Sequence, residues 1–304
     1  MVSPARRRDA VAYLCRRHKV SERRACQVVG QHRSTQRYAA VPSDFETRLV
    51  KEMNALAEQH PRFGYRMIHS MLVDAGWAVN RKRIERLWRL EGHRVPPARK
   101  KRWGNDAIGV DANSAWNLPA TAPDHVWSYD FVAARTSNGG PLRILNVVDE
   151  FTRECVGVHV ARNIGARDVA RFLERVIAKR GAPRILRSDN GREFTADVLV
   201  AWLNDHGIAP AFVAKASPQQ NCYVERFNGT MRDQLLNGEQ FHSVTEARVV
   251  IAGWIELYNT VRPHRALGMK TPSRYADEWR KTNPAGRRDV QSASAINGST
   301  KGGG

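Results

Sequence analysis

The 304-residue chain contains 49 Lys and Arg against 30 Asp and Glu, a formal net charge of +19, and 42% of its residues are hydrophobic. This length is at the upper limit for one core, so more than one domain is expected, and the apolar content excludes a chain disordered throughout. The charge favours a polyanionic partner. No apolar run of about 18 residues and no apolar N-terminal signal segment is present, which predicts a cytoplasmic protein without a membrane span.

The positive charge is concentrated in the first third of the chain. Residues 1–105 contain 24 Lys and Arg against 9 Asp and Glu, and the remainder is close to balance. We therefore expect the first third to hold DNA and the rest to form a globular body. None of the four cysteines forms a C-x-x-C pair, which predicts free thiols in a reducing compartment. A zinc site is the alternative for Cys15, His18, Cys26 and His32.

Residues 1–40 are predicted to form three short helices, the length of a helix-turn-helix unit. The second helix is expected to follow Ser21, a typical N-cap, and to end at Gly30. Its inward-facing residues are expected to be Ala25, Val28 and Val29. The short third helix would present Arg33 and Arg37 to DNA. A three-helix unit that only packs is the alternative.

Residues 41–95 are predicted to form a second helix-turn-helix-like domain that binds DNA. Ser43 and Glu46 form a capping box at the start of its first helix. A later helix carries a basic face that would contact the DNA backbone. The candidate contacts on it are Arg81, Lys82, Arg83 and Arg86. A solvated cationic face is the alternative. The proline-containing residues 96–123 are predicted to be a linker.

From residue 124 onward, short apolar strands alternate with helices. Strands are expected at 127–134, 142–149, 155–161, 184–188 and 208–214, and helices at 166–180, 195–206 and 219–236. The order βββαβαβα predicts an α/β fold for residues 124–240, a ribonuclease H-like mixed five-stranded sheet preceded by all-α helix-turn-helix units. Residues 241–283 are expected to extend this core with helices, and residues 284–304 to be disordered.

Three carboxylates stand out by their positions in these elements. Asp130 interrupts an apolar strand, Asp189 follows the fourth strand and Glu225 lies on the last helix of the core. A charge in a core strand is costly unless it is paired or binds a metal. Two Mg²⁺ ions require hard oxygen ligands and open positions for a phosphate. The three residues together predict a two-metal catalytic site in which Mn²⁺ can replace Mg²⁺, although each alone would suit an ordinary surface acid.

Two residues share a helical face with Glu225. Asn221 lies one turn before it and Arg232 two turns after it. Arg232 is the preferred DNA contact of the core, because a fixed cation near two metals suits phosphate binding. Asn221 is a further candidate DNA contact. For Arg232 the alternative is a surface arginine paired with a nearby acid.

The spacing of these residues resembles a known signature. Thirty-five residues separate Asp189 from Glu225, and with Arg232 behind them they resemble the Asp-Asp-(thirty-five)-Glu pattern of retroviral integrases and insertion-sequence transposases. The details look most like the OrfB product of insertion-sequence family three, and the resemblance covers about residues 15–280. The stretches that carry it are 20–26, 31–38, 63–66, 188–191, 217–228 and 258–268.

The resemblance implies a metal-dependent DNA transposase in which Asp130, Asp189 and Glu225 are the metal ligands. Such an enzyme nicks an element end, and the freed 3′-OH attacks a second phosphodiester. Its partners would be double-stranded DNA, as terminal inverted repeats and target, the OrfA product or a fusion with it, and further copies of itself on DNA. A retroviral-type integrase is one alternative, although it should carry an N-terminal His-His-Cys-Cys zinc domain. A non-catalytic DNA-binding regulator is another, although all three carboxylates are present.

Overall fold

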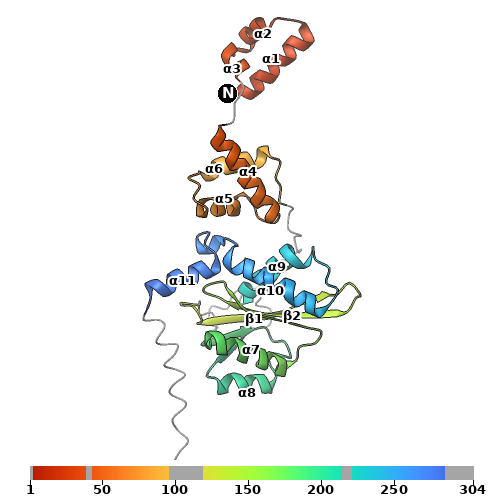
Figure 1. The fold of residues 1–304 in the computed structure, drawn as a ribbon, viewed down its shortest axis with the longest axis vertical. Helices are drawn as coiled ribbons and strands as arrows, with labels where there is room; N and C mark the ends of the chain where they lie inside the picture. The colour runs from red at the N-terminus through yellow and green to blue at the C-terminus, as the bar shows by residue number, and fades with distance from the viewer. Residues whose placement is uncertain (1–2, 39–42, 96–118, 214–220, 285–304) are drawn as a thin grey trace, which may run out of the picture. The chain divides into compact units, whose positions relative to one another are not determined.

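The computed structural model describes residues 3–38, 43–95, 119–213 and 221–284, and the chain divides into two compact units, residues 1–55 and 56–304 (Figure 1). Most of the predicted linker, the start of the stretch 217–228 and almost all of the tail lie outside these ranges. Within the described ranges, no helix is both long enough and apolar enough to cross a lipid bilayer.

The first unit begins with three helices, α1 (Pro4–His18), α2 (Glu22–Val29) and α3 (Arg33–Arg37). As predicted, Ser21 caps α2, and Gly30 ends it with a φ of +66° in the left-handed region. The prediction that Val28 faces inward is wrong, because its side chain is 73% exposed. The stripe of α2 that packs against α1 runs through Ala25, Cys26 and Val29, and Val28 lies beside this stripe.

Three further helices follow before the linker, α4 (Asp44–Gln59), α5 (Tyr65–Asp74) and α6 (Arg81–Leu90). At the start of α4, the Ser43 hydroxyl accepts a hydrogen bond from the Glu46 amide, as the capping box predicts. Asn80 caps α6 by accepting from the amide of Lys82. Ile84, Leu87 and Trp88 form the buried side of α6, so its basic residues occupy the other side.

The remainder of the second unit is built on a five-stranded sheet with the order β3-β2-β1-β4-β5. The strands are β1 (Val126–Arg135), β2 (Pro141–Asp149), β3 (Cys155–Ala161), β4 (Ile185–Ser188) and β5 (Ala209–Phe212). The first three form an antiparallel meander, and β4 and β5 extend the sheet in parallel from β1. This mixed sheet and the element order βββαβαβα confirm the predicted ribonuclease H-like fold.

Helices cover both faces of the sheet (Figure 1). They are α7 (Ala166–Arg180), α8 (Asp197–Asp205), α9 (Cys222–Met231) and α10 (Val244–Thr260). On β1, Trp127 and Tyr129 belong to the core under α7 and α8, whereas Val132 belongs to the core under α9 and α10. Because strand side chains alternate, Asp130 shares the face of Val132. Asn146 lies directly opposite Asp130 on β2 and points to the same face.

The C-terminal part of the unit is helical, as expected. The predicted helix 219–236 is α9 followed by a π-helical turn over Arg232–Leu236. The predicted extension contains α10, a short turn over Arg265–Leu267 and α11 (Pro272–Thr282). Pro272 lies in the first turn of α11, where its missing amide proton is not needed.

Candidate active site

Asp130 lies in the middle of β1, and its carboxylate is held at both oxygens. Oδ1 accepts the amide of Phe131 at 2.7 Å, and Oδ2 accepts Nδ2 of Asn228 at 2.9 Å. Burial above all, together with the charges of Asp189 and Glu225, raises the pKa of Asp130 to about 6 against the lowering effect of the two hydrogen bonds. Asp130 is therefore a partly desolvated carboxylate surrounded by like charges.

Asp189 follows β4, the parallel neighbour of β1, and a tight turn fixes its side chain. Its Oδ1 accepts the amide of Gly191 at 2.9 Å. A Cβ at Gly191 would stand 3.0 Å from this oxygen and 3.3 Å from the ring of Phe194, so glycine permits the close approach. Asn190 connects the turn to the end of β5, since its Nδ2 donates to the carbonyl of Val213 at 2.6 Å. The Ser-Asp-Asn-Gly motif thus positions Asp189 by local bonds.

Glu225 lies in the first turn of α9, whose buried side fixes the helix on the sheet. Phe227 packs edge-on against Trp254 and Tyr258 of α10, with ring centroids 5.6 and 4.7 Å apart. Tyr258 in turn meets His264 at 4.7 Å. His264 is 9% exposed, and burial lowers its pKa to about 3, so it is a neutral packing residue. The stretch 258–268 therefore supports the helix that carries Glu225.

The three predicted carboxylates thus come from β1, from the end of β4 and from α9. They are near enough for Asp189 and Glu225 to raise the pKa of Asp130. Among the residues that the structure describes, no three His, Cys, Asp or Glu side chains are close enough together to hold one metal ion. The carboxylates of Asp189 and Glu225 are neighbours of Asp130 but do not form a closed cluster with it, which agrees with the repulsion between like charges. Hard oxygen donors and accumulated negative charge fit a divalent cation, which would relieve this repulsion.

Glu193, in the turn that follows Asp189, pairs with a residue that the sequence analysis missed. Nη1 of Arg143 on β2 lies 2.6 Å from its carboxylate, and this arginine lowers the pKa of Glu193. The guanidinium of Arg143 lies 4.0 Å from the ring centroid of Phe131, which stacks on Phe194. Arg143 therefore connects β2 to the turn that carries Asp189.

Asp149 ends β2 and Glu150 begins the turn after it, and both side chains are buried. Asp149 accepts the amides of Asp124, Phe151 and Thr152 at 2.6, 2.7 and 2.9 Å. Glu150 pairs with Arg187 at 2.9 Å. The sequence alone does not reveal the burial of Glu150, because its arginine partner comes from β4, 37 positions away.

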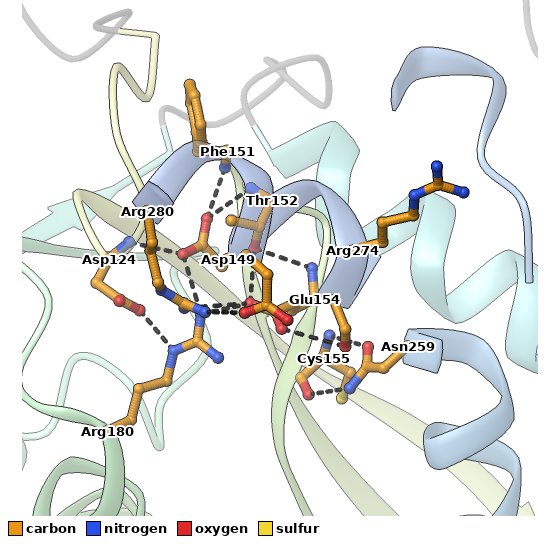
Figure 2. A network of polar contacts seen from close by, with 12 residues as sticks. Asp124, Asp149, Phe151, Thr152, Glu154, Cys155, Arg180, Asn259, Arg274 and Arg280 are labelled. Atoms are coloured by element: carbon orange, nitrogen blue, oxygen red, sulfur yellow. Dashed lines mark hydrogen bonds and ion pairs between the residues drawn. The ribbon is translucent and has the colours of Figure 1, made fainter. Parts of the chain in front are cut away.

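Figure 2 shows the network around Asp149, which joins the start of β1 to α7 and α11. Arg180 lies 2.6 Å from the carboxylates of Asp124 and Glu154, and 3.6 Å from that of Asp149. Arg280 of α11 approaches Glu154 to 3.8 Å. Burial and the charge of Asp124 raise the pKa of Asp149 to about 6. The network therefore holds three carboxylates close together with arginine between them.

The predicted DNA contacts lie in several places. In the first unit, Arg33 and Arg37 both pair with Glu22, at 3.5 and 2.8 Å. On α6, the four candidates are all exposed, namely Arg81, Lys82, Arg83 and Arg86. Arg232 is exposed, and its Nη1 donates to the carbonyl of Ala133 at 3.4 Å. Asn221 is only 3% exposed at the N-cap position of α9, so contact with DNA would require it to become accessible.

Comparison with known proteins places the chain among insertion-element proteins. Family models described as an integrase core domain match residues 120–218 and 206–272, and one described as an HTH-like domain matches residues 44–102. An uncharacterized 39.2 kDa protein of insertion element IS476 from Xanthomonas euvesicatoria is 38% identical over 92% of this chain and 79% of its own length. An uncharacterized 31.7 kDa protein of IS407 from Burkholderia multivorans is 40% identical over 88% of this chain and 94% of its own. The transposase of IS904 from Lactococcus lactis is 28% identical over 74% and 91%, respectively.

Proposed function

Because the chain belongs to the OrfB-type transposases of insertion-sequence family three and is a DNA transposase of the integrase type, we propose that it cleaves the ends of its element and joins the freed 3′-OH ends to DNA. The observation that supports this proposal is the placement of three carboxylates on β1, directly after β4 and on α9, near enough for Asp189 and Glu225 to raise the pKa of Asp130. Their oxygen donors and their mutual repulsion suit divalent metal ions.

Asp130, Asp189 and Glu225 are proposed to hold two Mg²⁺ ions, with Mn²⁺ as a substitute. When bound, such ions supply an activated attacking oxygen and stabilise the leaving 3′-oxygen. The chain's own residues prepare the site. Asn228 orients Asp130 through a 2.9 Å hydrogen bond, and Gly191 leaves room for the carboxylate of Asp189.

The helical segments that precede the linker are proposed to bind the terminal inverted repeats. Residues 1–40 and 41–95 carry most of the net charge and the exposed basic face of α6, and residues 124–240 with the extension 241–283 form the catalytic part. Neutralising phosphates by Lys and Arg releases counterions, so this binding should weaken as salt rises.

The proposal also concerns assembly. A coiled coil requires a sustained heptad repeat, and this sequence has none. We therefore include the OrfA product, or a fusion with it, as a partner, and a homo-oligomer on DNA as the working assembly.

The decisive experiment is strand cleavage on duplex DNA that carries the element's own ends. We expect cleavage and joining with Mg²⁺ or Mn²⁺ and neither with EDTA, and a duplex with scrambled ends is the control. Undiminished cleavage in EDTA would overturn the metal assignment. Tight end binding without cleavage in any metal would instead favour the regulator hypothesis.

Arg232 provides a second, narrower test. We expect Arg232→Ala to weaken DNA binding and strand joining about tenfold, because a charge-assisted contact to phosphate is lost. Metal binding should be unchanged. Arg232→Lys should retain part of the activity, since a point charge replaces a bidentate fork. Gel-shift and strand-transfer assays measure both effects.

A matched control for this substitution exists on β1. Arg135 is also exposed and also donates to a backbone carbonyl, that of Gly139 at 3.3 Å. Arg135→Ala removes the same charge from the last residue of β1. If Arg232→Ala affects DNA binding no more than Arg135→Ala does, Arg232 is only a solvated surface residue.

A further inference from the structure

A pair of buried amides lies behind Asp130. Asn146 is fully buried on β2, directly opposite Asp130 in the antiparallel register. Its Nδ2 donates to Oδ1 of Asn228 at 2.8 Å, and Nδ2 of Asn228 donates to Oδ2 of Asp130 at 2.9 Å. The three polar side chains therefore form one hydrogen-bonded line from β2 through α9 to β1, within an otherwise apolar layer.

The direction of this line follows from the carboxylate at its end. An ionised carboxylate only accepts hydrogen bonds, so Asn228 must turn its NH₂ group toward Asp130 and its oxygen away. Asn146 must then donate to that oxygen. Its only other neighbour in hydrogen-bond reach among the described residues is the sulfur of Met231, 3.8 Å from Nδ2.

This arrangement leaves one polar atom unsatisfied. Oδ1 of Asn146 is buried and has no hydrogen-bond partner among the residues that the structure describes. An unsatisfied buried carbonyl oxygen destabilises a fold. A leucine at this position would fill similar space in the same apolar layer without that oxygen. Packing therefore does not explain why residue 146 is an asparagine. The hydrogen bond that its Nδ2 donates to Asn228 does explain it.

We propose that Asn146 is a positioning residue for the reaction: it fixes the amide of Asn228 in the one orientation that holds Asp130 ready to bind metal. This inference rests on the proposed function. Without Asn146, Oδ1 of Asn228 loses its donor, and Asp130 alone holds the Asn228 amide. The amide is then fixed at one end instead of two, so it holds the carboxylate of Asp130 less firmly.

The test measures metal binding directly, in the full-length chain without DNA, from the fall of the free Mn²⁺ signal in electron paramagnetic resonance. We expect Asn146→Leu to weaken Mn²⁺ binding about fivefold. The melting temperature should change little, because the substitution removes one unsatisfied oxygen, on Asn146, and creates one, on Asn228. Asn146→Val, which suits a strand, provides a second variant in case the leucine is not accommodated, and the same loss is expected.

A double-substitution cycle tests whether Asn146 acts through Asn228. Asn228→Leu should weaken Mn²⁺ binding at least as much as Asn146→Leu does, and combining the two should add no further loss. Wild-type binding by both Asn146 variants, or an undiminished second loss in the Asn228→Leu background, would overturn the inference.

Asp189→Asn, measured in parallel, separates this inference from the proposed function. If Asp189→Asn binds Mn²⁺ as the wild type does, the proposed metal site itself is wrong. If Asp189→Asn loses binding while both Asn146 variants retain it, the metal site stands and only the role of Asn146 fails.

Discussion

Asp130→Asn, Asp189→Asn and Glu225→Gln should each reduce end cleavage and joining by about 10³-fold or more while leaving end binding intact. Metal ions contribute several kcal/mol of transition-state stabilisation, and about 4 kcal/mol corresponds to this factor. Cleavage kinetics on element-end duplexes, with gel shifts on the same DNA, provide the measurement. Asp205→Asn, at the exposed end of α8, is the matched control for loss of a negative charge.

Stability separates a catalytic role from a structural one. Because the folded-state pKa of Asp130, about 6, lies above its ordinary value, ionisation of this group opposes folding as pH rises from about 4 to about 6. At pH 7 the metal-free Asp130→Asn variant should therefore be at least as stable as the wild type. Cleavage by the variant at the wild-type rate would remove Asp130 from the metal site, whereas a variant less stable than the wild type at pH 7 would contradict the raised pKa.

Arg180→Met should lower the free energy of unfolding by about 3–5 kcal/mol, because it leaves buried carboxylates without their main countercharge. Arg180 lies within 2.6 Å of two carboxylates and 3.6 Å of a third (Figure 2). Arg171→Met on the same helix is the control. Arg171 forms an exposed pair with Asp168, and its loss should change stability by less than about 1 kcal/mol.

The effect of Arg180→Met should depend on pH. Asp149 has a folded-state pKa of about 6, and Arg180 keeps it from rising further. A carboxyl group with a raised folded-state pKa stabilises the fold at low pH, and this contribution is lost as pH rises through that pKa. The penalty of Arg180→Met should therefore be smaller at pH 5 than at pH 8 in urea unfolding. Equal penalties at the two pH values would mean that burial of charge is not its cause.

Local patterns in the sequence were sufficient to predict the catalytic sheet. Short apolar runs indicate β1 to β3, and the Ser-Asp-Asn-Gly turn places Asp189 at the end of β4. Both features depend on neighbours a few residues away. Asn146 gave the same kind of signal as Asp130, a polar residue interrupting an apolar strand. It was missed because an amide, unlike a carboxylate, does not by itself indicate a metal.

Contacts between distant segments could not be predicted in this way. The network of Asp124, Asp149, Glu154 and Arg180 joins residues 56 positions apart. No local sequence pattern indicates which buried acid pairs with which arginine, because the pairing depends on how α7 packs on the sheet. The pairing of Arg143 with Glu193 has the same origin.

The support of α9 by downstream aromatic residues has a consequence for incomplete products of translation. All three acids have been synthesised once residue 225 is made, yet Phe227 packs against Trp254 and Tyr258, and Tyr258 against His264. A polypeptide released before residue 254 possesses the acids but lacks the surface that fixes the third of them. Termination between residues 226 and 253 therefore yields a protein that keeps the helical segments proposed to bind DNA but lacks the surface that fixes Glu225.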